Sequence, residues 1–467
     1  MQVEQLYTGC LSEAAYFIAS EGEAAVIDPL RDVDVYISKA EEMGVQIKYI
    51  FETHFHADFV SGHLELSKKT GAPIIYGPQT TAGFKIHVAT DGEEFAIGKL
   101  KLKVLHTPGH TLESTCYLLH DEHEKPYCVF TGDTLFVGDV GRPDLFSGNL
   151  SKEDLAGYMY DSLNNKIKKL PDDVIVYPAH GAGSSCGKNL GKETFSTIGT
   201  QKQLNYALQD MSKEEFIKVI TSGLNTPPVY FSENARINKE GHDMLDDVMV
   251  KAMQPLSIAA FKEKTKEDTW ILDTREATVF TQGFVPNSIS IGLEGRFAEW
   301  AGSLIPLGQA LVLVTEAGKE KETVIRLARV GIDNVQGYLE GGFEAWQHAG
   351  ERIDMIIDVE AEELAMDLPH DNKLEVLDVR KQTEFEGGHV RGAKNIPLDT
   401  LTDPLNIAMI HEDHNLYIHC AGGYRSVIAA SLLKREGYHN LRNVLGGFAK
   451  IKNVKGMTIV TPERTNA

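Results

Sequence analysis

An internal repeat in the C-terminal part of this 467-residue chain is the feature that most constrains its fold. The stretch Ile271–Arg275 (ILDTR) returns as Val376–Arg380 (VLDVR), at an offset of 105 residues. The offset holds for the pairs Phe280/Phe385, Gly283/Gly388 and Val285/Val390, and returns at Gly342-Phe343/Gly447-Phe448. A duplicated unit of about 100 residues is the size of a small α/β domain. The repeat therefore predicts two related α/β domains, over 254–352 and 360–460.

The residues before the repeat are enough for one larger domain. At roughly 150 residues per domain, the length of the chain suggests about three domains in all. Short apolar runs such as Ala24–Asp28 and Gln46–Glu52 alternate with helical spacing, as over Val33–Met43. We therefore expect a multidomain α/β protein with a first domain over 1–235, followed by a helical extension and linker to about 253.

Composition limits the partners and the compartment. The formal net charge of −21 repels polyanions, so we expect neither nucleic acid nor a membrane surface as a partner. No apolar run approaches the ~20 residues of a membrane helix, and the start of the chain lacks the basic region of a secretory signal. Five scattered cysteines form no disulfide framework. These features together favour a cytoplasmic protein.

Metal-capable side chains in the first domain follow short apolar strands. The carboxyl ends of strands are where open sheets usually carry their sites. A lone histidine would be weak evidence, but an ordered set at successive strand ends predicts a metal site. The set comprises His54, His56 and Asp58 in one loop, and His110, Asp133 and His180 in three others.

The order HxHxD, TPGHT, TGD and PAH resembles the metallo-β-lactamase superfamily over roughly 1–235, and implies a four-layer αββα sandwich. In the binuclear zinc hydrolases of that superfamily, such as glyoxalase II, the first motif continues HxHxDH. Here Phe59 follows Asp58, which removes a ligand of the usual second metal. The segment Gly138–Asp144 is similar to the persulfide dioxygenase branch.

That resemblance implies one Fe(II) per chain, held by His54, His110 and Asp133. Two histidines and one carboxylate with open positions are the ligand set of non-haem Fe(II) oxygenases. His56, Asp58 and His180 would orient the ligands and bound water. Arg142 would bind a carboxylate of the substrate, with a salt-bridged turn as the structural alternative. Cys186, in a glycine-rich loop after His180, is a possible thiol relay or an inert loop thiol; Cys10 is a weaker candidate.

The activity that this branch implies is oxidation of a low-molecular-weight thiol persulfide by O2, its co-substrate, to sulfite and thiol. Zinc cannot supply this step because it has no redox chemistry. Glutathione, coenzyme A, cysteine and bacillithiol all remain candidate carriers. The family resemblance also favours a homodimer or homotetramer.

A second reactive centre is predicted at the end of the buried-strand pattern Leu416–His419. The loop Cys420–Ser426 (CAGGYRS) leads into a helical run, and a nest of backbone N–H groups at such a junction stabilises a thiolate. The stretch resembles the rhodanese active loop, which implies that Cys420 carries a persulfide and that Arg425 closes the loop and helps to hold an anionic sulfur donor. The remaining loop residues expected to bind substrate are Gly422, Gly423, Tyr424 and Ser426.

The first repeat lacks this nucleophile. With one residue of slippage, Glu316 stands opposite Cys420 and Lys321 opposite Arg425. A carboxylate cannot carry sulfane sulfur, so 254–352 is expected to be a rhodanese-like domain without transferase activity. This domain either spaces and docks the two neighbouring domains, or it connects them without a further role.

Together these motifs predict a persulfide dioxygenase and thiosulfate sulfurtransferase on one chain. Sulfite made at the metal would accept sulfur from Cys420 to give thiosulfate, or the transfer would run in reverse. Two alternatives remain open: a binuclear zinc thioester hydrolase with rhodanese domains, and a non-enzymatic sulfur-carrying scaffold.

Overall fold

The computed structural model describes residues 1–145 and 150–461, and the chain forms two compact units. The first unit contains Met1–Asp247 together with Ile325–Gly331. The second contains Val248–Val324 and the chain from Ile332 onward.

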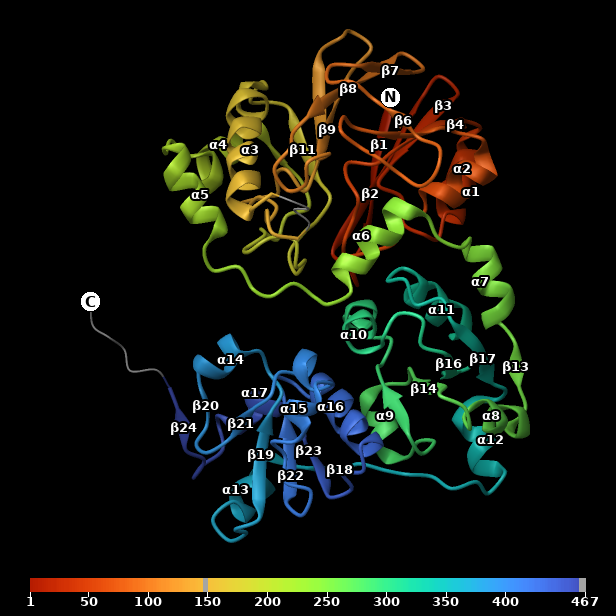
Figure 1. Ribbon diagram of the computed structural model, residues 1–467, viewed down its shortest axis with the longest axis vertical. Helices are drawn as coiled ribbons and strands as arrows, with labels where there is room; N and C mark the ends of the chain where they lie inside the picture. Colours follow the sequence, from red (N-terminus) through yellow and green to blue (C-terminus); the bar gives the residue numbers. More distant parts are fainter. Residues whose placement is uncertain (146–149, 462–467) are drawn as a thin grey trace. The chain divides into compact units, whose positions relative to one another are not determined.

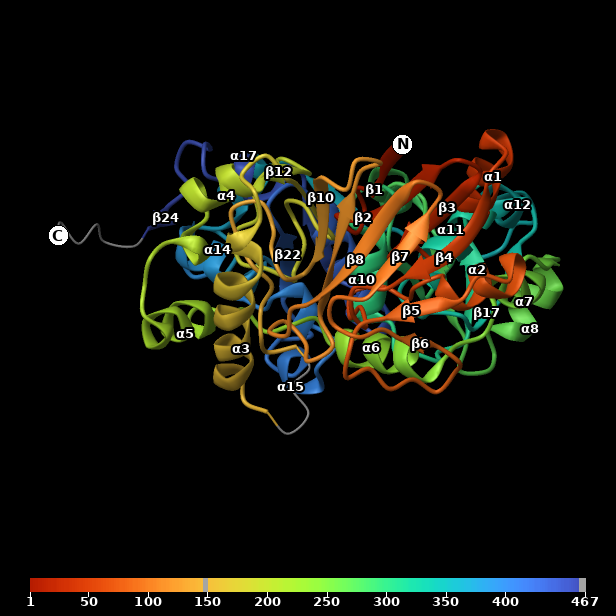
Figure 2. The same ribbon diagram turned by 90° about the horizontal axis from the view of Figure 1, so that it is seen from above.

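Two six-stranded sheets face each other in the first unit (Figures 1 and 2). Their inner faces share one apolar core, which includes Tyr16, Phe51, Tyr117 and Phe130. The first sheet has the order β1 (Gln2–Thr8), β2 (Glu13–Ser20), β3 (Glu23–Ile27), β4 (Gln46–Phe51), β5 (Ile74–Tyr76), β6 (His87–Val88). The second has the order β12 (Ser196–Thr197), β11 (Ile175–Pro178), β10 (Pro126–Gly132), β9 (Thr115–His120), β8 (Leu100–His106), β7 (Glu94–Ile97).

Helices cover both outer faces of these sheets and complete the predicted αββα sandwich. One core joins α1 (Asp34–Met43) to the outer face of the first sheet, and another joins α3 (Lys152–Asn165), α4 (Ile198–Leu204) and α5 (Lys213–Thr221) to the second (Figure 1). The predicted helix at Val33–Met43 is confirmed, and it ends at Gly44 in the left-handed conformation (φ 63°) that glycine adopts without strain. The helices are α1 (Asp34–Met43), α2 (His63–Thr70), α3 (Lys152–Asn165), α4 (Ile198–Leu204), α5 (Lys213–Thr221), α6 (Phe231–Glu240) and α7 (Leu245–Ala252), with short 3-10 turns at Ile167–Lys169 and Tyr206–Leu208.

The second unit holds two five-stranded sheets of the same strand arrangement, in which every pairing is parallel. The strands of the first sheet and the helices between them are, in chain order, β13 (Pro255–Leu256), α8 (Ile258–Lys264), β14 (Trp270–Asp273), α9 (Ala277–Gln282), β15 (Ser288–Ser290), α10 (Phe297–Leu304), β16 (Leu311–Val314), α11 (Glu320–Ala328), β17 (Val335–Leu339) and α12 (Gly342–His348). The second contains β18 (Ile357–Val359), α13 (Ala361–Asp367), β19 (Leu374–Asp378), α14 (Gln382–Glu386), β21 (Lys394–Asn395), a 3-10 turn (Leu398–Thr400), α15 (Pro404–Ile407), β22 (Asn415–His419), α16 (Tyr424–Arg435), β23 (Leu441–Val444) and α17 (Gly447–Ile451), while β20 (His389–Val390) pairs with β24 (Ile459–Val460).

A buried ion pair shows that the repeat in sequence is a repeat in structure. Arg275 bonds the carboxylate of Asp273 and the carbonyl of Gly283, and its guanidinium lies 4.1 Å from the ring centroid of Phe343. The second repeat has the same arrangement 105 residues later, with Arg380 bonded to Asp378 and Gly388 and 3.9 Å from the ring of Phe448. The motif residues that revealed the repeat are therefore core residues that hold each sheet to its loops. The limits 1–235, 254–352 and 360–460 stay predictions.

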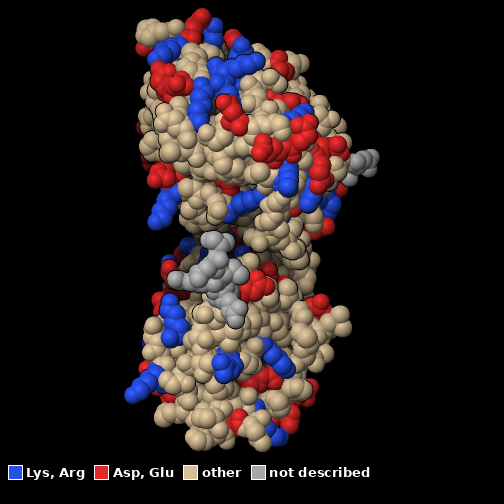
Figure 3. Space-filling model, turned by 90° about the vertical axis from the view of Figure 1, so that its left-hand side faces the viewer, with Lys and Arg blue, Asp and Glu red and all other residues tan. Residues whose placement is uncertain are grey.

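Acidic and basic side chains are interspersed on the face shown in Figure 3. Among the described residues, no helix combines the length and the apolar character that a membrane span requires.

Candidate metal centre and sulfur-transfer loop

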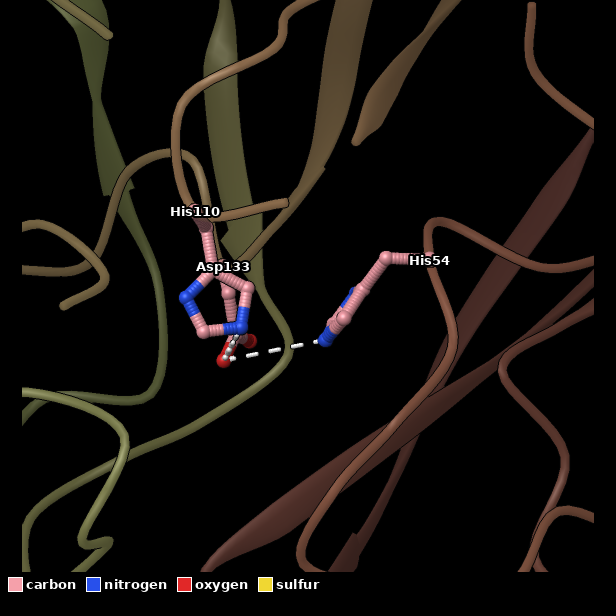
Figure 4. A group of neighbouring side chains, drawn as sticks. All are labelled: His54, His110 and Asp133. Carbon is pink, nitrogen blue, oxygen red and sulfur yellow. Dashed lines mark ion pairs between the residues drawn. The ribbon is translucent and has the colours of Figure 1, made fainter. Parts of the chain in front are cut away.

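The three predicted metal ligands lie at one end of the sandwich, each on a loop beside a strand end (Figure 4). His54 follows β4, His110 lies between β8 and β9, and Asp133 follows β10 directly. Gly132 permits this approach: its φ is 50°, and a Cβ atom there would lie 2.6 Å from the Thr53 side chain.

The ligand atoms of these three side chains converge. Nε2 of His110 lies 3.4 Å from Oδ2 of Asp133, and Nε2 of His54 lies 3.9 Å from the same oxygen (Figure 4). All three residues are buried, at 2% exposure or less. The sequence prediction that these loops converge agrees with this geometry, while the role of each residue as a ligand stays a prediction.

Hydrogen bonds fix the histidine tautomers in the form that metal binding needs. His110 donates from Nδ1 to the carbonyl of Arg142 at 2.7 Å. Thr53 donates its hydroxyl proton to Asp28, so the same hydroxyl accepts from Nδ1 of His54 at 2.9 Å. A proton on Nδ1 leaves Nε2 with a free lone pair. Both Nε2 lone pairs are therefore available on the side of Asp133.

The electrostatics of the site also suit a cation. Both carboxylate oxygens of Asp133 are buried without a hydrogen-bond partner, and the same is true of Nε2 of His180. Burial and the charges of neighbouring histidines lower the pKa of His54 well below its usual value, so this ring is neutral. An unpaired buried carboxylate is costly unless a cation compensates it. The donor set therefore fits a bound metal ion.

A second group of metal-capable residues lies beside the first. Ligand atoms of His56, Asp58 and His180 lie within 4.8 Å of one another. His56 is drawn to a different partner, because its Nε2 lies 3.1 Å from Asp28. Although burial opposes protonation, this carboxylate raises the pKa of His56 to about 10. Phe59 is fully buried and packs on the His56 ring, with centroids 4.3 Å apart.

Arg142 is engaged within the protein. Its Nε and one terminal nitrogen bond the Asp144 carboxylate at 2.7 and 2.8 Å, and the guanidinium also donates to the carbonyls of Ser185 and Asn225. Its side chain is 4% exposed. Arg142 therefore forms the salt-bridged turn that was the alternative to substrate binding. In this structure its guanidinium is already paired with a carboxylate of the protein.

Cys186 lies at the metal centre, as its position after His180 suggested. Its sulfur lies within 4.8 Å of ligand atoms of Asp133 and His180, and the residue is 1% exposed. Burial and the nearby carboxylates raise the pKa of the Cys186 thiol well above its usual value, so the thiol is protonated. Its role as a relay stays a prediction.

A pocket begins next to two of the ligands. Phe55 follows His54 and Thr111 follows His110, so any molecule bound in the pocket contacts the ligand loops. Among the described residues, the Lys239 ammonium has no carboxylate partner. The walls include Phe55, Gln79, Thr80, Thr111, Glu113 and Lys239.

The predicted sulfur-transfer loop joins β22 to α16. The Cys420 side chain is buried, and the backbone N–H of Gly423 donates to its sulfur at 3.1 Å. The Ser426 hydroxyl lies 3.7 Å from the same sulfur. Gly423 has a φ of 118°, which lets the loop turn its N–H groups inward. The loop thus supplies a backbone N–H donor that faces the sulfur, as expected for the predicted nest of N–H groups.

Two loop residues have partners that sequence reasoning missed. Arg425 forms a bidentate pair with Glu384, at 2.7 and 2.9 Å, and this pair lowers the pKa of Glu384. Tyr424 donates its hydroxyl to the carbonyl of Gly292, in the first repeat. Glu384 lies 41 residues from Arg425 in the sequence. The one local signal for Glu384 is its place in the first turn of α14, where its side chain completes a capping box, and this signal does not indicate a pairing with Arg425.

Comparison with known proteins gives the class. Residues 8–180 match the metallo-beta-lactamase superfamily, and residues 257–349 and 360–454 match the rhodanese-like domain. A probable hydroxyacylglutathione hydrolase of Schizosaccharomyces pombe is 30% identical over 262 residues, 50% of this chain and 96% of that protein. The chain belongs to the metallo-β-lactamase superfamily and carries two rhodanese-like domains.

Two further comparisons refine this assignment. A metallo-beta-lactamase structure from Staphylococcus aureus is 33% identical with a TM-score of 0.65, and the match covers 73% of this chain and 99% of that one. The mitochondrial persulfide dioxygenase of Homo sapiens is 32% identical over 209 residues, 44% of this chain and 73% of that protein. The predicted fold is confirmed, and the domain organisation is that of a persulfide dioxygenase–rhodanese fusion.

Proposed function

We propose that the first unit oxidises a low-molecular-weight thiol persulfide with O2 at one Fe(II). The balanced reaction is RSSH + O2 + H2O → RSH + HSO3⁻ + H⁺, in which the terminal sulfur gives four electrons to O2. A bound Fe(II) would supply redox chemistry and open positions for the two substrates.

One observation carries this proposal: two histidines and one carboxylate converge. In addition, Phe59 follows Asp58 where the HxHxDH motif of the binuclear hydrolases has a histidine. The protein residues have definite tasks. In both His54 and His110, the Nδ1 proton is held by a hydrogen bond, to Thr53 and to the Arg142 carbonyl, so that Nε2 faces Asp133. His180 likewise donates Nδ1 to the carbonyl of Ser12 at 3.2 Å, which leaves Nε2 free to accept from bound water.

The experiment is anaerobic purification, metal quantification and oxygen uptake with several thiol persulfides. We expect one iron per chain and one O2 consumed for each sulfite formed. Two zinc ions per chain together with thioester hydrolysis would contradict the proposal.

A thioester hydrolase is the second candidate. His56, Asp58 and His180 are close enough to hold a second ion, and the Schizosaccharomyces pombe relatives are named probable hydroxyacylglutathione hydrolases. A binuclear site would generate a metal-activated hydroxide. The His56–Asp28 contact and the buried Phe59 ring weigh against this candidate.

Phe59→His tests the difference between the two candidates. The substitution places an imidazole beside His56 and Asp58, and so supplies the ligand that binuclear relatives have. After the metal-free proteins are reconstituted with excess zinc, we expect the variant to bind close to two ions per chain and the parent about one. Phe59→Leu is the matched control, and equal zinc content in all three proteins would argue against the assigned role of Phe59.

We propose that the second repeat transfers sulfane sulfur through Cys420. In the forward direction, the cysteine persulfide reacts with sulfite, so that enzyme-S–S⁻ + SO3²⁻ gives enzyme-S⁻ + S2O3²⁻. The N–H of Gly423 supports the sulfur anion, which favours this role. Sites on one chain raise the effective concentration of sulfite at the loop.

The pocket beside the ligand loops is proposed to receive the carrier part of the persulfide. Its unpaired Lys239 suits a carrier with a carboxylate. We expect Lys239→Gln to raise KM by about three- to tenfold for carboxylate-bearing persulfides and to leave kcat unchanged. The exposed Lys218→Gln is the control. An unchanged KM for Lys239→Gln would show that the carrier binds elsewhere.

A further inference from the structure

A chain of polar side chains runs from the sulfur-transfer cysteine to the cysteine-less repeat. Ser426 Oγ lies 3.7 Å from Cys420 Sγ and donates to Oδ1 of Asn443 at 2.7 Å. Asn443 Nδ2 donates to Oδ1 of Asp358 at 2.7 Å, and Thr281 Oγ1 donates to the other oxygen of Asp358 at 2.7 Å. Thr281 belongs to α9 of the first repeat, while the other four residues belong to the second.

The carboxylate of Asp358 fixes the direction of every bond in this chain. An ionised carboxylate only accepts hydrogen bonds. Asn443 must therefore turn its NH2 group to Asp358 and its carbonyl to Ser426. The single hydroxyl proton of Ser426 then points to Asn443, or to the carbonyl of Gly423 at 2.9 Å, and not to sulfur. Ser426 thus presents lone pairs, and not its proton, to the sulfur of Cys420.

Thr281 is the contribution of the cysteine-less repeat. Asp358 lies on the edge strand β18 and is partly exposed, so its side chain could otherwise turn to solvent. Thr281 is 1% exposed, and its hydroxyl donates to the carboxylate oxygen that Asn443 leaves open. The carbonyl of Gly292, also in the first repeat, holds the Tyr424 hydroxyl at the start of α16.

We propose that Thr281 and Asp358 are positioning residues that act through Asn443 and Ser426 to restrain the reactivity of Cys420. The cysteine-less repeat then has a task beyond docking, because it sets the proton direction beside its neighbour's nucleophile. This inference rests on the proposed function only in taking Cys420 as the sulfur carrier.

The test is the rate at which iodoacetamide alkylates Cys420 in the full-length protein at pH 7, measured by mass spectrometry of its peptide. In Asp358→Asn, the new amide can donate to the Asn443 carbonyl, so Asn443 turns its NH2 to Ser426 and frees the serine proton to point at sulfur. We expect alkylation to be about three- to tenfold faster, the factor of one neutral hydrogen bond. Thr281→Val should act in the same direction but less, and Thr281→Ser should restore the parental rate.

Two controls separate positioning from general loosening. Thr278→Val, at an exposed position of the same helix, should keep the parental rate. Asp358→Asn should have no effect on the rate in a Ser426→Ala background, because the path through the serine is gone. A parental or slower rate in Asp358→Asn, or an equal acceleration by Thr278→Val, would overturn the inference. Alkylation needs neither iron, O2 nor sulfite, so failure of the proposed function leaves this test readable.

Discussion

Cys420→Ser is expected to abolish sulfane-sulfur transfer and to leave oxygen uptake at the parental level. A serine hydroxyl cannot hold a sulfane sulfur as a persulfide, so the covalent intermediate is lost. We expect the rate of thiosulfate formation from sulfite and a persulfide donor to fall by at least about a hundredfold. Oxygen uptake should persist because its proposed ligands lie in the first unit.

The product analysis makes this prediction sharper. The parent should convert part of its sulfite to thiosulfate, whereas Cys420→Ser should accumulate sulfite alone. Cys128→Ser, in the buried strand β10, is a control for the loss of a thiol as such. Thiosulfate formation at the parental rate by Cys420→Ser would show that another group carries the sulfur. Loss of oxygen uptake in that variant would show that the two activities depend on each other.

The convergence of metal-capable side chains could be predicted because their motifs are local, whereas the choice of ligands among them came from the family resemblance and stays a prediction. His54, His56 and Asp58 lie in one loop, and the Thr-Gly-Asp133 and His110 motifs each lie next to a strand that apolar alternation reveals. The same is true of the Cys420 loop, where strand, glycine-containing turn and helix are contiguous. Local patterns of this kind identify the residue and also place it next to the end of a strand.

Partners that are distant in the sequence could not be predicted. The pairing of Arg142 with the Asn225 carbonyl spans 83 residues, and the contact of Thr281 with Asp358 spans 77. Whether an arginine in a glycine-rich turn faces substrate or its own protein depends on such contacts. The sequence showed Arg142 as a cation near the site, but its pairing with the carboxylate of Asp144 and with the distant Asn225 carbonyl appears only in the folded structure.

The buried partners of His56 are a second example of contacts that could not be predicted from the sequence. Asp28 ends an apolar run that is readily seen as a strand, yet its carboxylate reaches across to Thr53 and His56 only in the folded sheet. The contact with Asp28 distinguishes His56 from His54. The HxHxD motif alone cannot do so, because it contains both histidines at equivalent spacing.

Asp133→Asn is expected to remove both the metal and the oxygenase activity. Within the described ranges, Asp133 is the carboxylate that lies near both His54 and His110. A neutral amide is a much weaker ligand for a hard divalent cation. Loss of a ligand should weaken metal affinity by at least about a hundredfold, more than the 10- to 100-fold typical of outer groups. Oxygen uptake should fall to background, with Asp210→Asn, whose side chain is fully exposed, as the matched control.

Thermal unfolding provides a second measurement that does not depend on activity. In the metal-free parent, both oxygens of Asp133 are buried without a partner, so Fe(II) added without O2 should raise Tm by binding the folded state alone. The same addition should leave the Tm of Asp133→Asn unchanged. If this variant kept the parental metal content and the parental rise in Tm, the ion would have to lie in the neighbouring group of His56, Asp58 and His180. The proposed iron site at His54, His110 and Asp133 would then be wrong.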